Sequence, residues 1–365
     1  MRTLPNAVAG LGAALALACA VVASSWGCGG GAAPGGHWVG TPIEGGVDVF
    51  DLGSAYPKAD PDPDGGTQAA PEFEGGAAPG PFSCTGKKGG GGDPILSLTS
   101  GNLPRTSLLH VPSGYDPAKG TMLVLNFHGF TSDDLQQEVI TRMNGSADKH
   151  GYLVAYPQGV ARSWNAGDCC GTAWTDSVDD VAFVKALLAK IEGDWCVDPK
   201  RVYAAGFSNG GFLSHRLACE MSDVFAAIAP VSGVFGMDPA KCTPARPVPV
   251  LHFHGTADPI VPYNGGTPIV PIDLGPILAF RSVADSLQIW RTKNGCLGGP
   301  STIYANGDAE CVQWQGCKAD VVHCRIDQGG HTWPGGVPIP LAGKTSTDIS
   351  ATETMYGFFT AHPMP

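Results

Sequence analysis

The sequence predicts an α/β fold with one mostly parallel, doubly wound sheet, which follows a signal peptide and a disordered linker. After Cys84, short runs rich in β-branched and aromatic residues alternate with longer helical stretches, the order that parallel βαβ units produce. Several short runs are apolar throughout, as expected for strands covered on both faces. We therefore assign residues 1–27 to the signal peptide, 28–83 to the linker and 84–365 to one folded domain.

The strands and helices of that domain follow from these runs in chain order. Strands are predicted at 107–111, 122–127, 153–156, 202–206, 226–231, 250–254 and 321–326. Helices are predicted at 135–150, 179–195, 209–220, 280–294 and 348–361. Ser346 and Thr347 precede the last helix and are its candidate caps.

The first residues have the composition of a secretory signal. Arg2 precedes an apolar run over 7–23, and small residues follow it. Ser25-Trp26-Gly27-Cys28 resembles a bacterial lipoprotein cleavage site with Cys28 as the lipidated residue, although such sites prefer a branched aliphatic residue where Ser25 stands. Plain secretion and lipidation of Cys28 both remain open.

The linker carries most of the acidic excess. Residues 29–83 hold eight acidic side chains against Lys58 alone, which is −7 of the net −11. This glycine- and proline-rich segment shows no helical or strand period, so it lacks the apolar area that would offset its ordering entropy. Because the chain has no cluster of lysine and arginine, we expect no nucleic-acid partner, and a membrane only through an N-terminal lipid.

Ten cysteines lie beyond the N-terminal region. An even number after a signal peptide predicts an oxidising, extracytoplasmic destination, either secreted or anchored to the cell envelope, and up to five disulfides. We expect the neighbours Cys169 and Cys170 to pair with different partners, because a ring between adjacent residues is strained. No C-x-x-C spacing is present, so a metal site is disfavoured.

Gly206-Phe207-Ser208-Asn209-Gly210 fits the G-x-S-x-G pattern of a nucleophile elbow. The pattern alone is weak in a chain with 52 glycines, but here a predicted strand precedes it and a predicted helix follows. A tight turn between strand and helix exposes the serine hydroxyl. The context predicts Ser208 as a nucleophile.

A serine nucleophile needs a base and an acid that orients it, and in this kind of fold both follow the serine, the acid first. Asp258 lies in a loop at the end of the strand 250–254, although its position alone is equally typical of a turn aspartate. Three histidines come later. His323 falls within a strand and His362 near the terminus, whereas His331 sits in a glycine-bracketed loop after a strand, which favours His331 as the base.

The tetrahedral intermediate of acyl transfer needs backbone donors for its oxyanion. The N–H of Asn209, next to the nucleophile, is the first candidate. The second comes from the loop after the strand 122–127, where Asn126-Phe127-His128-Gly129-Phe130 nominates the N–H of Phe130.

Taken together, these stretches resemble the secreted feruloyl esterases and polyhydroxybutyrate depolymerase-like enzymes of the α/β-hydrolase superfamily. The resemblance covers the chain from about residue 84 to the end and rests on residues 128–130, 163–171 with 178–183, 198–211, 254–258 with 261–263, and 330–335. It implies Ser208, Asp258 and His331 as the triad of a catalytic α/β-hydrolase domain. One departure is Phe130, where many relatives have cysteine or another small residue.

The resemblance implies an extracellular serine esterase that needs no metal or organic cofactor and forms an acyl-enzyme. Its expected substrates are feruloyl or acetyl esters of plant cell-wall polysaccharide or its oligomers, with Trp164 and Trp333 as candidates for flanking the acyl group. Hydrolysis of poly(3-hydroxybutyrate) or a short polyester is the second interpretation, because it uses the same machinery. A catalytically silent binding lipoprotein is the third, disfavoured because no triad position is missing.

Overall fold

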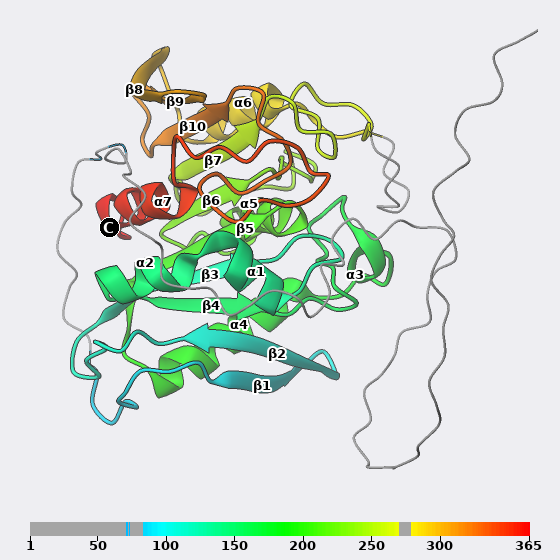
Figure 1. Cartoon of the computed structure of the whole chain (residues 1–365). Coiled ribbons are helices and arrows are strands. Elements are labelled where there is room, and N and C mark those ends of the chain that lie inside the picture. Colours follow the sequence, from blue (N-terminus) through cyan, green and yellow to red (C-terminus); the bar gives the residue numbers. More distant parts are fainter. Residues whose placement is uncertain (1–70, 72, 74–82, 270–278) are drawn as a thin grey trace, which may run out of the picture. The chain divides into compact units, whose positions relative to one another are not determined.

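A computed structural model describes residues 71, 73, 83–269 and 279–365. One ten-stranded sheet runs through the described domain in the order β1-β2-β4-β3-β5-β6-β7-β10-β9-β8 (Figure 1). The strands are β1 Ile95–Ser100, β2 Leu103–His110, β3 Thr121–Phe127, β4 Leu153–Pro157, β5 Val197–Phe207, β6 Ala227–Val231, β7 Val250–Gly255, β8 Pro300–Asn306, β9 Ala309–Trp314 and β10 Val321–Ile326.

The centre of the sheet is parallel and its edges are antiparallel. Strands β4, β3, β5, β6, β7 and β10 pair in parallel, whereas β1 and β2 on one side and β9 and β8 on the other add antiparallel pairs. Strands β3, β4, β6 and β7 are buried along their whole length, as strands with helices on both faces are. The predicted mostly parallel α/β fold is confirmed.

Helices cover both faces of this sheet (Figure 1). Helices α1, α2 and α7 lie on one face, and α4, α5 and α6 lie on the other. Their bounds are α1 Asp134–Thr141, α2 Met143–His150, α3 Gly171–Thr175, α4 Asp180–Asp194, α5 Asn209–Glu220, α6 Val283–Lys293 and α7 Ala351–Ala361.

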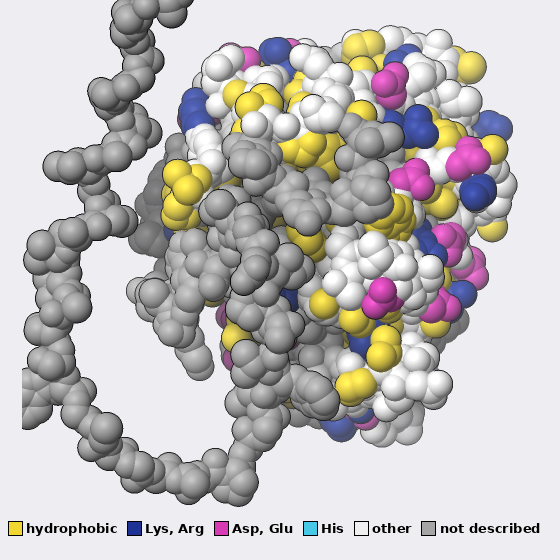
Figure 2. Space-filling model, turned by 90° about the vertical axis from the view of Figure 1, so that its right-hand side faces the viewer, with side chains coloured by type: hydrophobic (Ala, Val, Ile, Leu, Met, Phe, Trp, Pro, Cys, Tyr) yellow, Lys and Arg dark blue, Asp and Glu magenta, His cyan; other side chains and the backbone are white. Residues whose placement is uncertain are grey.

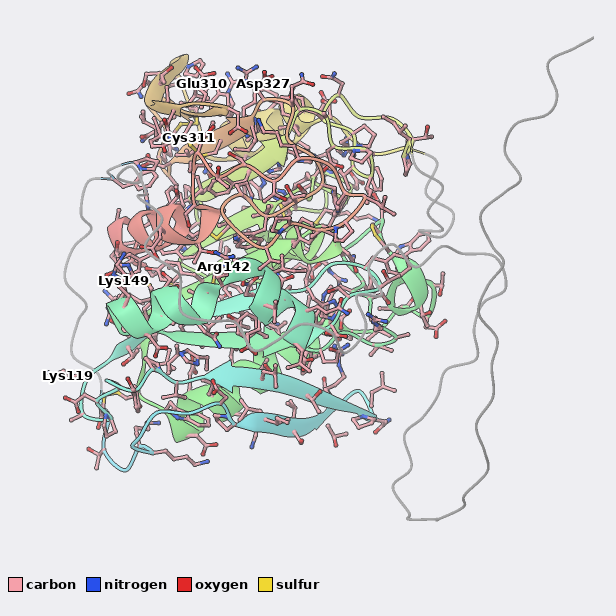
Figure 3. All side chains as sticks on the ribbon, in the orientation of Figure 1. Lys119, Arg142, Lys149, Glu310, Cys311 and Asp327 are labelled. Carbon is pink, nitrogen blue, oxygen red and sulfur yellow. A yellow bond between two sulfur atoms is a disulfide. The ribbon has the colours of Figure 1, made fainter. Side chains whose placement is uncertain are left out.

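Three helix predictions need correction. The helix expected over 280–294 is α6, which begins at Val283 after its cap Ser282. The single helix expected over 135–150 is two helices, because Arg142 adopts a left-handed conformation with φ 52° and ends α1 (labelled in Figure 3). The last helix begins later than predicted, and its cap is Ser350, whose hydroxyl accepts the N–H of Glu353. Ser346, an expected cap, instead donates to the carboxylate of Asp308.

The outer strands β1, β8 and β9 and the short helix α3 were not predicted. Their patterns are weak, since β1 and β8 leave most of their side chains partly or fully exposed. Antiparallel edge strands need only one buried face, and their stability comes from the neighbour they pair with.

All ten cysteines of the described region form disulfides, in the pairs Cys84–Cys196, Cys169–Cys170, Cys219–Cys242, Cys296–Cys317 and Cys311–Cys324. The expectation that Cys169 and Cys170 reach different partners is wrong. The two cysteines are bonded to each other, with their Cα atoms 3.1 Å apart.

Basic and acidic side chains are interspersed on the described part of the face drawn in Figure 2, with no field of one sign. Among the described residues, no helix is both long and apolar enough to span a bilayer.

The expected signal peptide, Cys28 and nearly all of the expected linker lie outside the described residues. Within the linker range, the ring of Phe73 packs edge-on against Phe358 of α7, with centroids 5.2 Å apart.

Candidate active site

Ser208 occupies a sharp turn between β5 and α5, with φ 52° and ψ −119°. Glycines on either side make this turn possible. A Cβ on Gly206 would lie 2.3 Å from the carbonyl oxygen of Gly210, and one on Gly210 would lie 2.1 Å from that of Phe127. Because those contacts are with backbone, no side-chain movement would relieve them. The turn holds Ser208 at the carboxyl end of the central strand.

Asp258 lies just past β7, two strands away from β5 in the sheet. Its side chain is fully buried, and its Oδ1 accepts the backbone N–H groups of Ile260 and Val261 at 2.9 and 2.8 Å. Two backbone donors on one oxygen fix the carboxylate orientation and leave Oδ2 facing away from the turn.

His331 follows β10 at the same edge of the sheet, and its Nδ1 lies 2.7 Å from Oδ2 of Asp258. A carboxylate accepts, so Nδ1 carries the proton, and Nε2 of the neutral ring is the proton acceptor. The two loops are joined by a hydrogen bond from the N–H of Ala257 to the carbonyl of Gly329, at 2.9 Å. The imidazole also lies against Phe207, the residue before Ser208, with ring centroids 4.8 Å apart.

The ionisation of Asp258 suits an orienting acid. Burial alone would raise the pKa of this carboxyl, but attraction to His331 and hydrogen bonds from His254 and His331 outweigh burial and hold the pKa below its usual range. Asp258 is therefore an anion at neutral pH, and its Oδ2 lies beside Nδ1 of His331.

The loop after β3 brings its backbone close to Ser208. A Cβ on Gly129 would lie 3.3 Å from Cβ of Ser208. The carbonyl of Gly129 accepts from Nδ1 of His128 at 2.7 Å and from the N–H of Ser132 at 3.2 Å. In a trans peptide the next N–H points the opposite way, so the N–H of Phe130 is directed away from those two donors.

His128 holds this loop as a neutral ring. Its Nε2 accepts the N–H of Gly159 at 2.9 Å, and burial lowers its pKa to about 4. Asn209 is the first residue of α5, where backbone N–H groups have no partner within the helix. Its N–H and that of Phe130 are therefore two donors on elements that flank Ser208.

The two expected substrate contacts, Trp164 and Trp333, are both fully buried. The indole N–H of Trp164 donates to the carbonyl of His128 at 2.9 Å, and that of Trp333 donates to the hydroxyl of Thr352 at 3.0 Å. With no exposed surface and a satisfied N–H, each ring packs in the core, and we do not include them among the substrate contacts.

Two supporting interactions were missed from the sequence. The side-chain amide of Asn209 accepts the N–H of Trp164 at 2.7 Å and donates to the Trp164 carbonyl at 3.1 Å, which connects the loop 163–171 to the turn at Ser208. Behind that loop, Arg105 and Asp180 form a buried ion pair at 2.8 Å, and Asp180 also accepts the N–H of Asn165. Residue type alone gives no signal for either, since each partner is distant in the sequence.

In the part of the chain that the structure describes, no three His, Cys, Asp or Glu side chains are grouped so as to hold a metal ion. Ser208 follows β5, and the paired side chains of Asp258 and His331 follow β7 and β10, so all three residues lie at the carboxyl ends of parallel strands.

Comparison with known proteins gives concordant results. The family model described as "Esterase PHB depolymerase" matches residues 107–261. The chain is 36% identical over 236 residues to feruloyl esterase B of Piromyces equi, covering 62% of this chain and 42% of that protein. It is 33% identical over 282 residues to the putative esterase NocK of Nocardia uniformis subsp. tsuyamanensis, covering 70% of this chain and 78% of that protein.

Among solved structures, the acetyl xylan esterase from Aspergillus awamori superposes with a TM-score of 0.52 at 16% identity, over 73% of this chain and all of that one. This likeness supports the fold of the described domain.

In the sequence comparisons, the chain spans less than half of the length of the Piromyces enzyme and most of the length of NocK.

Proposed function

Because the chain belongs to the feruloyl esterase and polyhydroxybutyrate depolymerase-like family of the α/β-hydrolase superfamily, a family of carboxylic-ester hydrolases, we propose that it is an extracellular serine esterase. The observation that carries the proposal is the 2.7 Å contact of His331 with Asp258 at the sheet edge where Ser208 forms its turn. We assign Ser208 as the nucleophile, His331 as the base and Asp258 as the orienting acid.

In the first half-reaction, the hydroxyl oxygen of Ser208 attacks the ester carbonyl while Nε2 of His331 takes its proton. Asp258 stabilises the imidazolium through Nδ1. The new C–O bond converts the carbonyl oxygen into an oxyanion, which the N–H groups of Phe130 and Asn209 receive. Loss of one such donor typically costs about 10²–10³-fold in rate.

The oxyanion then collapses and the ester C–O bond breaks. The imidazolium gives its proton to the departing alkoxide, so an alcohol leaves and an acyl-Ser208 ester remains. In the second half-reaction a water attacks that ester, with His331 again taking a proton. The acid is released, and Ser208 regains its hydrogen from His331.

The substrate class we propose is feruloyl or acetyl esters of plant cell-wall polysaccharide. It is supported by similarity to proteins named feruloyl esterase and by a fold like that of an acetyl xylan esterase. Five disulfides in the described residues support an oxidising, extracytoplasmic location.

A panel of esters tests this proposal: methyl ferulate, acetylated xylan, and hydroxybutyrate oligomers, each assayed with the unchanged protein and with Ser208→Ala. We expect turnover of the first two and its loss in the variant. Preference for the oligomers would make the protein a polyester hydrolase. Turnover of none of them by the folded protein would favour a binding protein without activity.

A further inference from the structure

Three buried histidines lie side by side behind the proposed acid. His252 and His254 are on β7, and His323 is directly opposite His252 on the neighbouring parallel strand β10. Their exposed fractions are 0, 1 and 5%. A buried imidazole loses free energy unless its nitrogens have partners, so the partners of these rings identify what they hold in place.

The carbonyl oxygen of Val261 can only accept a hydrogen bond, and this fixes the direction of the hydrogen bonds that His254 and His252 make. Nε2 of His254 lies 2.8 Å from the carbonyl oxygen of Val261, so Nε2 carries the hydrogen. In the neutral ring Nδ1 then accepts, and the group 3.1 Å from it is Nε2 of His252, which donates. His252 thereby keeps His254 in the tautomer that donates to Val261.

This donation bears directly on Asp258. Val261 is one of the two residues whose N–H groups donate to Oδ1 of the carboxylate. The same Nε2 of His254 lies 3.4 Å from Oδ2, the oxygen that contacts His331. His254 therefore fixes the turn 258–261 by donating to the carbonyl of Val261. The same turn holds the carboxylate of Asp258 through the N–H groups of Ile260 and Val261.

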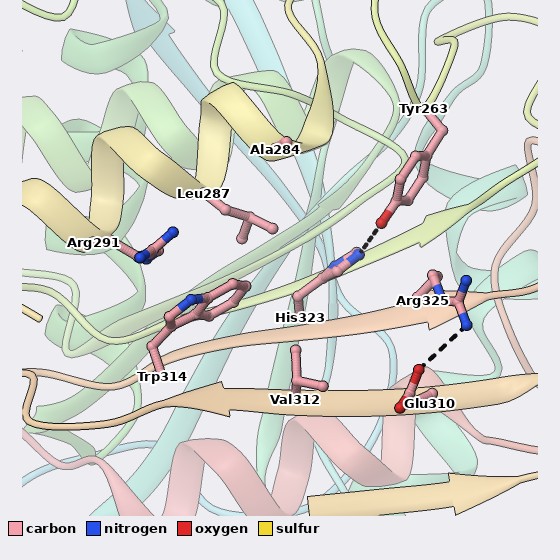
Figure 4. A pocket seen from close by; sticks show the side chains of 9 residues that line it. All are labelled: Tyr263, Ala284, Leu287, Arg291, Glu310, Val312, Trp314, His323 and Arg325. Carbon is pink, nitrogen blue, oxygen red and sulfur yellow. Dashed lines mark hydrogen bonds and ion pairs between the residues drawn. The ribbon is translucent and has the colours of Figure 1, made fainter. Parts of the chain in front are cut away.

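The chain of contacts continues outward to a pocket of about 270 Å³. Nδ1 of His323 donates to the carbonyl of His252 at 3.1 Å, so its Nε2 accepts from the hydroxyl of Tyr263, at 2.9 Å. Figure 4 shows the Tyr263 hydroxyl and the His323 ring meeting in that pocket, beside Trp314 and the Glu310 and Arg325 ion pair. Burial lowers the pKa of His323 to about 3 and that of His252 well below its usual value, in keeping with neutral rings.

We propose that His254 is a positioning residue for Asp258, held in its donating tautomer by His252. The proposal rests on the function proposed above. If the N–H at the Nε2 position is lost, the Val261 carbonyl loses its partner, the turn relaxes and the carboxylate no longer meets His331 in one orientation. The chemical step then slows. We expect little change in binding of the ester, because the hydrogen bonds of His254 go to His252 and Val261.

Two amide variants form a matched pair. The amide of His254→Gln reaches the Nε2 position and can donate to Val261, whereas that of His254→Asn reaches only the Nδ1 position and meets His252. Both keep a polar group in the core, and they differ by one methylene. Steady-state kinetics on a soluble ester and the pH profile of kcat/KM are measured for both, with thermal unfolding as the check on folding.

We expect His254→Asn to lower kcat by about 10- to 100-fold with KM within twofold and to move the acidic limb of the pH profile, because that limb reports the His331–Asp258 pair. His254→Gln should restore most of kcat. Equal kcat in the two variants, or an Asn variant within threefold of the unchanged protein, would overturn the proposal.

A measurement on the unchanged protein keeps the proposal testable if the Asn variant does not fold. Nitrogen NMR of the imidazoles should find the hydrogen of His254 on Nε2 and not on Nδ1, and a tautomer with its hydrogen on Nδ1 would contradict the proposal. Ser208→Ala in the same kinetic assay separates the two claims. Full turnover without the Ser208 hydroxyl refutes the proposed function, whereas an inactive Ser208→Ala beside two fully active His254 variants refutes positioning alone.

Discussion

Lowering the pH from 7 to 5.5 should destabilise the fold sharply, because four buried histidines are neutral in it. Burial lowers the pKa of His128 to about 4, of His215 and His323 to about 3, and of His252 well below its usual range. In the unfolded chain each returns to about 6.5. The unfolded state therefore binds more protons in this window, and the free energy of unfolding decreases as the pH falls through 6.5.

The size of the effect follows from those pKa values. Each of the four rings contributes a loss of about 1.2 kcal/mol between pH 7 and 5.5, or about 5 kcal/mol together. Asp134 acts in the opposite direction, because burial raises its pKa to about 6 and the folded state then holds the extra proton; its offset is about 0.8 kcal/mol. The net expected loss is about 4 kcal/mol.

Guanidinium unfolding at a series of pH values, with the disulfides intact, measures this loss. A matched variant is His215→Asn, whose amide oxygen can still accept the indole N–H of Trp290, which lies 2.8 Å from Nδ1 of His215, but cannot titrate. In this variant the free energy of unfolding should change less steeply with pH, because unfolding takes up about one proton fewer. An unfolding free energy that is constant within 1 kcal/mol, or that rises on acidification, would refute the assignment of neutral buried rings.

Two substitutions test the site and its turn. Asp258→Asn should lower kcat by about 10³–10⁴-fold without unfolding, because an amide brings no charge and can donate to Nδ1 of His331; a loss below about tenfold would point to another acid. Gly210→Ala should destabilise the protein by about 3 kcal/mol, measured by chemical unfolding, because its Cβ meets the Phe127 carbonyl at 2.1 Å. Gly193→Ala is the control, with nothing within 4 Å, and a similar loss in both variants would contradict this reason.

The parallel centre of the sheet was predictable because strands covered on both faces are apolar throughout. All seven predicted strands are present, and β10 has the predicted bounds. The strand contexts of Ser208 and Asp258 were predictable for the same reason, since each lies where an apolar run ends. Their assignment as a triad remains a proposal, with the His331–Asp258 contact as its support.

No signal in the sequence indicates which side chains and backbone groups meet in the folded chain. Cys169 and Cys170 form a disulfide with each other, although the sequence pattern favoured separate partners. The proposed roles of His252 and His254 depend on which ring nitrogen meets the other histidine and which meets the carbonyl of Val261. A histidine in an apolar strand has the same appearance in the sequence whether it fills the core or holds a carboxylate.

The central claim is that Ser208 is an activated nucleophile. Mass spectrometry after treatment with a fluorophosphonate tests it most directly, because the probe forms a covalent bond to such a serine. We predict one adduct per chain, located on Ser208 and absent from folded Ser208→Ala. A folded protein that stays unlabelled, or an adduct on a different residue, would contradict the claim.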